Sequence, residues 1–118
     1  MGGKDDYLRW VLEHLSGAEG VSSRRMFGGF GLYRNGVFFG IISGDTLFFK
    51  ASETSRADYE TRGMARFRPY RNKPLLSMSY YEVPADVLED ADECVRWAMQ
   101  AVAAGAVKKK SSKRRRGA

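Results

Sequence analysis

Two groups of basic residues are the first candidates for chemistry in this 118-residue chain. The group near the C-terminus consists of Lys108, Lys109, Lys110, Lys113, Arg114, Arg115 and Arg116. The other group alternates with Phe67 and Tyr70, and it consists of Arg66, Arg68, Arg71 and Lys73. Cations pair with phosphates and aromatic rings stack on bases, so both groups are candidate nucleic-acid contacts. The alternative for the second group is a solvated loop whose two aromatic side chains pack into the core.

The positive charge of the chain is concentrated in the C-terminal group. The formal net charge is +6, but without these seven residues positions 1–107 keep 13 basic and 14 acidic residues, a net charge of −1. The surface of the remaining domain therefore need not bind a polyanion. The basic segment itself has several possible roles: contact with nucleic acid, an anionic membrane or an acidic protein, or simply a solubilising terminus.

Composition divides the chain into a domain and a tail. Positions 1–105 contain the apolar residues that can build one core, and a chain of this length usually forms one domain. Positions 106–118 are dominated by like charges with almost nothing apolar to bury, which predicts a disordered basic tail.

Catalytic and metal-binding patterns are weak in this sequence. One cysteine, Cys94, and one histidine, His14, cannot assemble a Cys/His zinc site, and carboxylates at calcium-loop spacing are absent. Tyr80 and Glu82 share a strand face, an arrangement that serves acid–base chemistry less often than it completes a half-buried strand. We expect Cys94 to pack as a small apolar side chain. The sequence therefore predicts no metal, no cofactor and no enzymatic activity.

A glycine-rich run, with Gly28, Gly29 and Gly31, follows Arg25 and invites comparison with phosphate-binding loops. Its spacing matches neither the dinucleotide fingerprint nor the P-loop, and it opens a strand where those motifs open a helix. We expect these glycines to permit bends and close packing between helices and sheet.

The elements that must position these residues follow from periodicity and turn signals. Apolar spacing predicts a first helix over 5–15, ending near Gly17. It also predicts a short helix over 55–62, capped by Ser55 with Asp58 and stopped by Gly63, and a last helix over 85–104. Strands are expected over 25–27, 30–34, 37–42, 46–50 and 76–83, with tight turns at 35–36 and 44–45. The fold class is α+β: a two-layer domain with an antiparallel sheet of about five strands packed against the N- and C-terminal helices.

Neither a signal peptide nor a membrane span is visible in the sequence. Acidic residues occupy the positions where a secretory signal needs an apolar stretch, and no window approaches about 18 continuous apolar residues. We expect a cytoplasmic protein.

Several motifs together resemble the N-terminal domain of the TfoX/Sxy family, over about positions 5–104. The residues that carry the resemblance are Arg25, Met26, Phe27, Gly28, Gly29, Gly31, Tyr33, Gly36, Lys50, Tyr80 and Tyr81. The resemblance implies a bacterial regulator of competence gene transcription that works with a cyclic-AMP-responsive transcription factor and is not an enzyme. Full-length members are similar to a two-domain design. Because the basic tail stands here in place of the second, helical domain, we expect a stand-alone version of the first.

The sequence thus favours a non-enzymatic regulatory or adaptor domain with a protein partner, for which the transcription machinery is one candidate. Two alternatives remain open. One is a nucleic-acid-associated protein that binds nonspecifically through its basic tail. The other is a small-ligand-binding protein or enzyme that uses the open face of the sheet.

Overall fold

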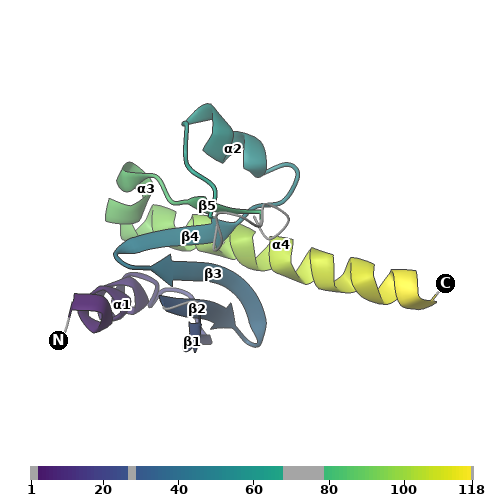
Figure 1. Cartoon of the computed structure of the whole chain (residues 1–118), viewed down its shortest axis with the longest axis horizontal. Helices are drawn as coiled ribbons and strands as arrows, with labels where there is room; N and C mark the ends of the chain where they lie inside the picture. Colours follow the sequence, from purple (N-terminus) through teal and green to yellow (C-terminus); the bar gives the residue numbers. More distant parts are fainter. Residues whose placement is uncertain (1–2, 27–28, 68–78, 118) are drawn as a thin grey trace.

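The computed structural model describes residues 3–26, 29–67 and 79–117, and for residues 3–5 and 107–117 it describes the backbone alone. The elements along the chain are α1 (Gly3–His14), β1 (Val21–Met26), β2 (Gly29–Arg34), β3 (Val37–Ser43), β4 (Thr46–Lys50), α2 (Arg56–Thr61), β5 (Tyr80–Glu82), α3 (Ala85–Glu89) and α4 (Ala91–Gly117) (Figure 1).

The five strands form one antiparallel sheet in the order β1-β2-β3-β4-β5, which confirms the predicted α+β architecture. Both predicted tight turns are present. Asn35 and Gly36 have φ values of 49° and 87°, as a type I′ hairpin requires, and Gly44 has a φ of 63° at the β3–β4 turn. One irregularity interrupts the register of β2 and β3, between Leu32 and Tyr33.

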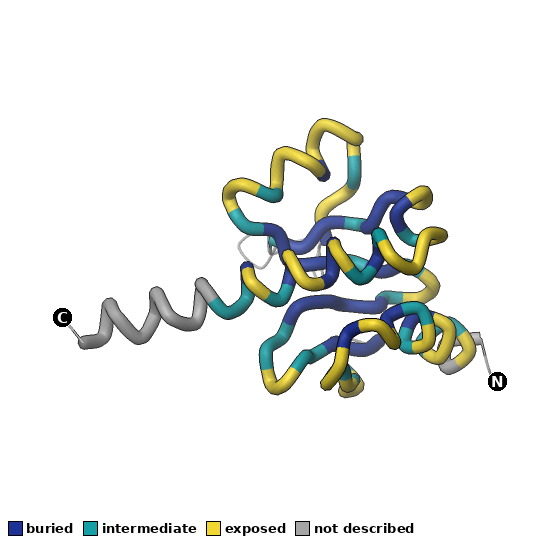
Figure 2. The backbone as a smooth tube through the Cα atoms, turned by 180° about the vertical axis from the view of Figure 1, so that it is seen from behind, coloured by how far each residue is buried: buried dark blue, intermediate teal, exposed yellow. Residues whose placement is uncertain are grey.

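Helices α1 and α4 pack on the same face of the sheet, where they lie in front of the strands in Figure 2. The largest fully buried side chains gather mainly between these layers: Phe39, Phe49, Leu15, Leu32, Ile42, Leu47, Val11 and Cys94. A smaller cluster lies on the opposite face and consists of Ile41, Phe67 and Tyr80, with Phe38 and Phe48 packed against it. The second face is therefore partly covered, although no helix among the described residues packs on it.

The last helix is not continuous as predicted. Asp90 adopts an extended conformation (φ −102°, ψ 108°) that separates α3 from α4. Its carboxylate accepts a hydrogen bond from the backbone N–H of Glu93 at 3.2 Å, so Asp90 caps the new helix. An aspartate is compatible with the interior of a helix or with an N-cap position. Here the packing of α3 against α4 favours the N-cap position.

The backbone of α4 is helical to Gly117, beyond the sheet (Figure 1), whereas composition predicts a disordered tail from position 106. The difference has a physical basis. Starting a helix is the costly step, and α4 is already formed where it packs on the sheet, so lysine and arginine need only extend it.

Other boundaries shift by local chemistry. Ser55 makes no side-chain cap on α2; instead the Ser52 hydroxyl accepts from the Ser55 N–H at 3.1 Å, and the Ser55 hydroxyl accepts from the Ser52 N–H at 2.8 Å. The predicted stop at Gly63 is confirmed, with φ of 71° and the paired hydrogen bonds of a Schellman motif. After α1, however, the positive φ is at Gly20 and not at Gly17.

Two predicted strand segments differ in extent from the observed strands. β1 begins at Val21, four residues earlier than predicted, while Phe27 and Gly28 lie outside the described residues. β5 occupies the end of the predicted strand, whose positions 76–78 are also not described. In the part of the chain that the structure describes, none of the helices has the length and apolar character needed to cross a membrane.

Candidate interaction surface

The sheet face opposite α1 and α4 carries a continuous row of side chains. Directly paired residues of neighbouring strands share a face, and the register places one such row across all five strands: Arg24, Gly31, Ile41, Phe48 and Glu82. This face, which is turned toward the viewer in Figure 1, is hereafter the open face.

Aromatic rings dominate the open face. Tyr33 stacks on Phe38 with ring centroids 5.1 Å apart, Phe38 lies 5.3 Å from Tyr80, and Phe48 lies 5.0 Å from Phe67. Tyr33, Phe38 and Phe48 are only half-buried. These five rings, called here the aromatic face, present partly exposed apolar and stacking area between strands that hold them rigidly.

Two charged groups border the aromatic face. The Lys50 ammonium lies 5.3 Å from the centre of the Tyr80 ring, and the Arg24 guanidinium lies 5.8 Å from that of Tyr33. Both distances are typical of cation–π contacts. Burial raises the pKa of the Tyr80 phenol well above its usual range, so this side chain stays neutral at physiological pH. Its surroundings favour packing over proton transfer.

Gly31 leaves the space into which its neighbours fit. A Cβ atom at this position would lie 2.7 Å from Met26 Sδ and 3.0 Å from Phe38 Cε1, both closer than normal contact. The glycine therefore allows the Met26 side chain and the Phe38 ring to lie flat against β2. This supports the structural interpretation of Gly31.

A second set of polar contacts lies on the other side of the sheet, where α2 meets α4. The Tyr81 hydroxyl donates a hydrogen bond to Glu60 Oε2 at 2.9 Å, and Tyr59 stacks on Tyr81 and meets Trp97 edge-on. Burial and this bond to Glu60 raise the pKa of Tyr81. The Arg66 guanidinium lies 5.9 Å from the centre of the Tyr81 ring.

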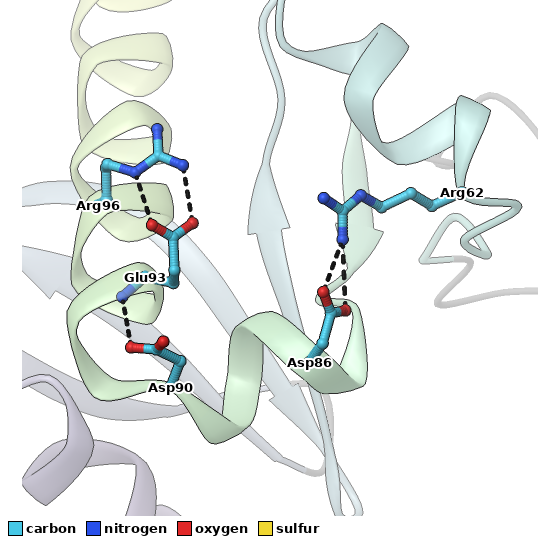
Figure 3. Close-up of polar contacts among 5 residues, drawn as sticks. All are labelled: Arg62, Asp86, Asp90, Glu93 and Arg96. Atoms are coloured by element: carbon cyan, nitrogen blue, oxygen red, sulfur yellow. Dashed lines mark hydrogen bonds and ion pairs between the residues drawn. The ribbon is translucent and has the colours of Figure 1, made fainter.

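Ion pairs complete this junction (Figure 3). Arg62 contacts the Asp86 carboxylate at 3.1 and 3.3 Å and lies over the Trp97 ring, which ties the end of α2 to α3 and α4. Arg96 makes a bidentate pair with Glu93 at 2.7 and 3.1 Å, and this guanidinium lowers the pKa of the Glu93 carboxyl. Both pairs are solvent-exposed, so each contributes little to the stability of the domain.

The structure describes only some of the basic residues that the sequence predicts as nucleic-acid contacts. Arg66 is exposed and its backbone pairs with Tyr81, while Phe67 is 6% exposed and packs under Phe48, as the alternative interpretation of this loop predicts. The remaining candidates of this loop lie outside the described residues: Arg68, Tyr70, Arg71 and Lys73. For the seven C-terminal cations, from Lys108 to Arg116, the structure describes the helical backbone but not the side chains.

The two remaining candidate groups lie in packing positions, with Cys94 buried and His14 half-buried. The Cys94 side chain is fully buried, and burial raises the pKa of its thiol to about 11. His14 stacks on Trp10 with ring centroids 4.3 Å apart. Within the described ranges, no three histidine, cysteine, aspartate or glutamate side chains lie close enough together to hold a metal ion.

Sequence reasoning missed Arg24 as a surface residue. Arg24 and Arg25 are exposed neighbours on β1, and they point to opposite faces of the sheet. Arg24 lies over Tyr33 on the open face, while Arg25 lies 5.8 Å from the centre of the Phe30 ring on the helix-covered face. The signal was present in the sequence as two adjacent arginines, but only the sheet order reveals that they lie on an edge strand.

Comparison with known proteins gives one clear relationship. The family model of the TfoX N-terminal domain matches residues 13–105, which include the whole sheet, α2, α3 and the sheet-packed part of α4. No curated protein matches the chain. The match begins near the end of α1, later than the resemblance noted from the motifs. Since it spans well over half of the 118 residues, the chain belongs to the TfoX N-terminal domain family.

Proposed function

We propose that this protein is a non-enzymatic regulatory or adaptor domain of the cytoplasm, connected with transcription as TfoX-type regulators of competence are, and that it acts by binding a protein partner. Membership of the family supports the class of function. The aromatic face is the observation that carries the mode of action, because it combines half-buried rings with an exposed arginine on a rigid sheet. Aromatic residues and arginine are the side chains most enriched at the energetic centres of protein interfaces.

The state of the titratable groups supports a binding role over catalysis. The Tyr80 and Tyr81 phenols have raised pKa values, and the Cys94 thiol, with a pKa of about 11, is almost wholly protonated at neutral pH. A general base or nucleophile needs the opposite shift or an activating neighbour. The Tyr81–Glu60 hydrogen bond and the Arg62–Asp86 pair each join segments that are distant in the sequence.

Affinity purification from the native cell tests this proposal. We expect a protein partner to be retained by the intact chain and by a Trp10→Ala variant, and to be lost from a Tyr33→Ala variant. Both substitutions remove a partly exposed aromatic side chain, but Trp10 lies on α1, away from the open face. Equal retention by both variants, or no retained protein at all, would contradict a partner site on the aromatic face.

The segregation of charge favours a second candidate function, nonspecific association with nucleic acid through the C-terminal segment. Seven of the 20 basic residues lie between positions 108 and 116, while the rest of the chain has a net charge of −1. If these cations neutralise up to seven phosphates, the log–log salt dependence on duplex DNA should be no steeper than about −6.

A chain ending at Gly105 provides the matched control for this candidate. Ala104 is the last buried residue of the described core, so the truncation removes little packing. We expect it to lose nearly all affinity for a random duplex at every salt concentration. Equal binding by the truncated chain would move the site to the loop from Arg66 to Lys73.

A further inference from the structure

The two edges of the sheet differ. The outer edge of β5 is covered by the preceding segment, because the Phe67 N–H donates to the Tyr80 carbonyl at 2.8 Å and the Glu82 N–H donates to the Ala65 carbonyl at 2.9 Å. The outer edge of β1 has no backbone partner among the described residues. An uncovered edge strand presents a row of donors and acceptors that can pair with another extended chain.

The hydrogen-bond pattern identifies which groups of β1 point outward. The Asn35 N–H donates to the Gly20 carbonyl at 3.0 Å, so this pair is a hydrogen-bonded pair of the β1–β2 ladder. Such pairs alternate along antiparallel strands. The backbone N–H and C=O groups of Ser22 and Arg24 therefore form hydrogen bonds with β2. The same groups of Val21, Ser23 and Arg25 point away from the sheet.

The side chains beside this edge are small or cationic. Ser22 is exposed and Ser23 is half-buried. A serine side chain is small, so neither residue obstructs an approaching strand. Arg24 and Arg25 lie on opposite faces, and neither forms an ion pair within the described part of the chain. Their guanidinium groups lie over Tyr33 and Phe30, which pre-orders them on each side of the edge and lowers the entropy lost on binding.

We propose that β1 binds an extended, acidic segment of a partner protein as an added strand, with two consecutive acidic residues facing Arg24 and Arg25. Consecutive residues of a strand point to opposite faces, so an adjacent acidic pair places one carboxylate beside each arginine. The inference rests on the proposed function as an adaptor, and it names the chemistry of the partner and a site distinct from the centre of the aromatic face.

Other occupants fit the edge less well. A second copy of this chain would bring its own Arg24 and Arg25 against the first pair, and like charges across a strand pair are destabilising. Phosphates of a nucleic acid would satisfy the arginines, but they offer no donors to the outward carbonyls of Val21, Ser23 and Arg25. A polypeptide with carboxylates satisfies both sets of groups.

A blocked, fluorescein-labelled peptide, Val-Thr-Glu-Glu-Thr-Val, is the direct probe, and the same peptide with Gln-Gln at its centre is the control. We expect the acidic peptide to bind the intact chain more tightly at low salt, by about 2- to 30-fold, because two exposed charge pairs of about 0.2–1 kcal/mol each are formed. The preference should shrink as salt screens these pairs.

A proline substitution separates the edge from the side chains. Ser23→Pro removes an outward N–H and leaves the hydrogen bonds between β1 and β2 in place, a position where an edge strand accepts proline. This substitution should lower the affinity for the Glu-Glu peptide by about tenfold or more, since it deletes a hydrogen bond and adds a steric block. Ser23→Ala changes the same side chain but keeps the N–H, and it should bind as the parent does.

Charge reversal tests the partner's chemistry without touching the backbone. Arg24→Glu combined with Arg25→Glu should abolish the preference for the Glu-Glu peptide and create one for a Lys-Lys version. Amide hydrogen exchange gives a residue-specific check: the peptide should slow exchange at Ser23 and Arg25, while Ser22 and Arg24, already bonded to β2, should change little.

Specific outcomes would overturn this assignment. Equal binding of the Glu-Glu and Gln-Gln peptides, or unchanged peptide binding by a folded Ser23→Pro variant, would contradict it. So would protection from exchange at Ser22 in place of Ser23. Concentration-dependent dimerisation that Ser23→Pro abolishes, while no peptide binds, would identify a second copy of the chain as the occupant. A natural partner that is lost with Tyr33→Ala and retained by the charge-reversed chain would refute the edge site yet leave the adaptor function standing. If no natural partner is found while the peptide binds tightly, the adaptor function is refuted and the edge site stands.

Discussion

Replacing Gly31 with valine should destabilise the domain, because the space that a side chain would need is already filled. A Cβ atom at Gly31 would lie 2.7 Å from Met26 Sδ, 2.8 Å from Met26 Cε and 3.0 Å from Phe38 Cε1. Overpacking of this kind costs about 1–3 kcal/mol. Removing a glycine from a strand interior returns about 0.5–1 kcal/mol. The difference spans about 0–2.5 kcal/mol, and because three contacts are too short we expect a net loss of unfolding free energy of about 1–2 kcal/mol, in the middle of this range.

The origin of the clash provides an internal control. The two shortest contacts are to the end of the Met26 side chain, so Met26→Ala should create the space that valine needs. In a double-mutant cycle, Gly31→Val should cost roughly 1 kcal/mol less in the Met26→Ala background than in the parent. Gly31→Ala should cost less than valine in both backgrounds, since the flexible methionine can turn away from a single methyl group.

Urea unfolding measures these differences, with fluorescence of the buried Trp97 as the signal. With a denaturant slope of about 2 kcal/mol/M, the Gly31→Val loss should lower the midpoint by roughly 0.5–1 M. Two results would refute the reasoning: a valine variant as stable as the parent, or an identical cost of valine with and without Met26. A stable variant that loses partner binding would instead give Gly31 a direct functional role.

Three further outcomes follow from the same structure. Gly29→Ala should be more destabilising than Gly31→Ala in urea unfolding, because its Cβ would meet the Ile42 carbonyl oxygen, which cannot rotate away. Cys94, whose pKa burial raises to about 11, should react with iodoacetamide at pH 8 only in denaturant; rapid labelling of the native chain would contradict its burial. Burial, followed by the charge of Asp45, raises the pKa of Tyr7 from 10.0 to about 12. The unfolded chain therefore deprotonates first, and melting temperature should fall as pH rises from 10 to 12, with a shallower fall in Tyr7→Phe than in the parent.

Local chemistry explains which parts of the fold were predictable. The turn at Asn35 and Gly36 needs positive φ at both positions, and the stop at Gly63 needs it at one, so these residues reveal the turns wherever they occur. Alternating and helical periodicities likewise located most of the strands and helices. These signals depend on a few neighbouring residues, which is why the meander and the terminal helices that pack on it could be anticipated from sequence alone.

Contacts between residues that are distant in the sequence could not be predicted from local patterns. The Tyr81–Glu60 hydrogen bond and the Arg62–Asp86 pair join residues 21 and 24 positions apart, and no local pattern distinguishes these partners from other exposed charges. The break at Asp90 had a similar cause, since a lone aspartate inside a helical pattern is compatible with either a continuous helix or a new N-cap.

The sequence by itself determined the family, the antiparallel sheet and the concentration of positive charge after residue 107, because motifs, turns and composition are properties of the chain in one dimension. Tertiary structure decided which edge of the sheet stays uncovered and which side chains border it. Arg24 and Arg25 are two arginines among many in the sequence. They become a candidate binding edge only because β1 lies at the end of the sheet, with its outward backbone groups unpaired among the described residues and an aromatic ring beneath each guanidinium.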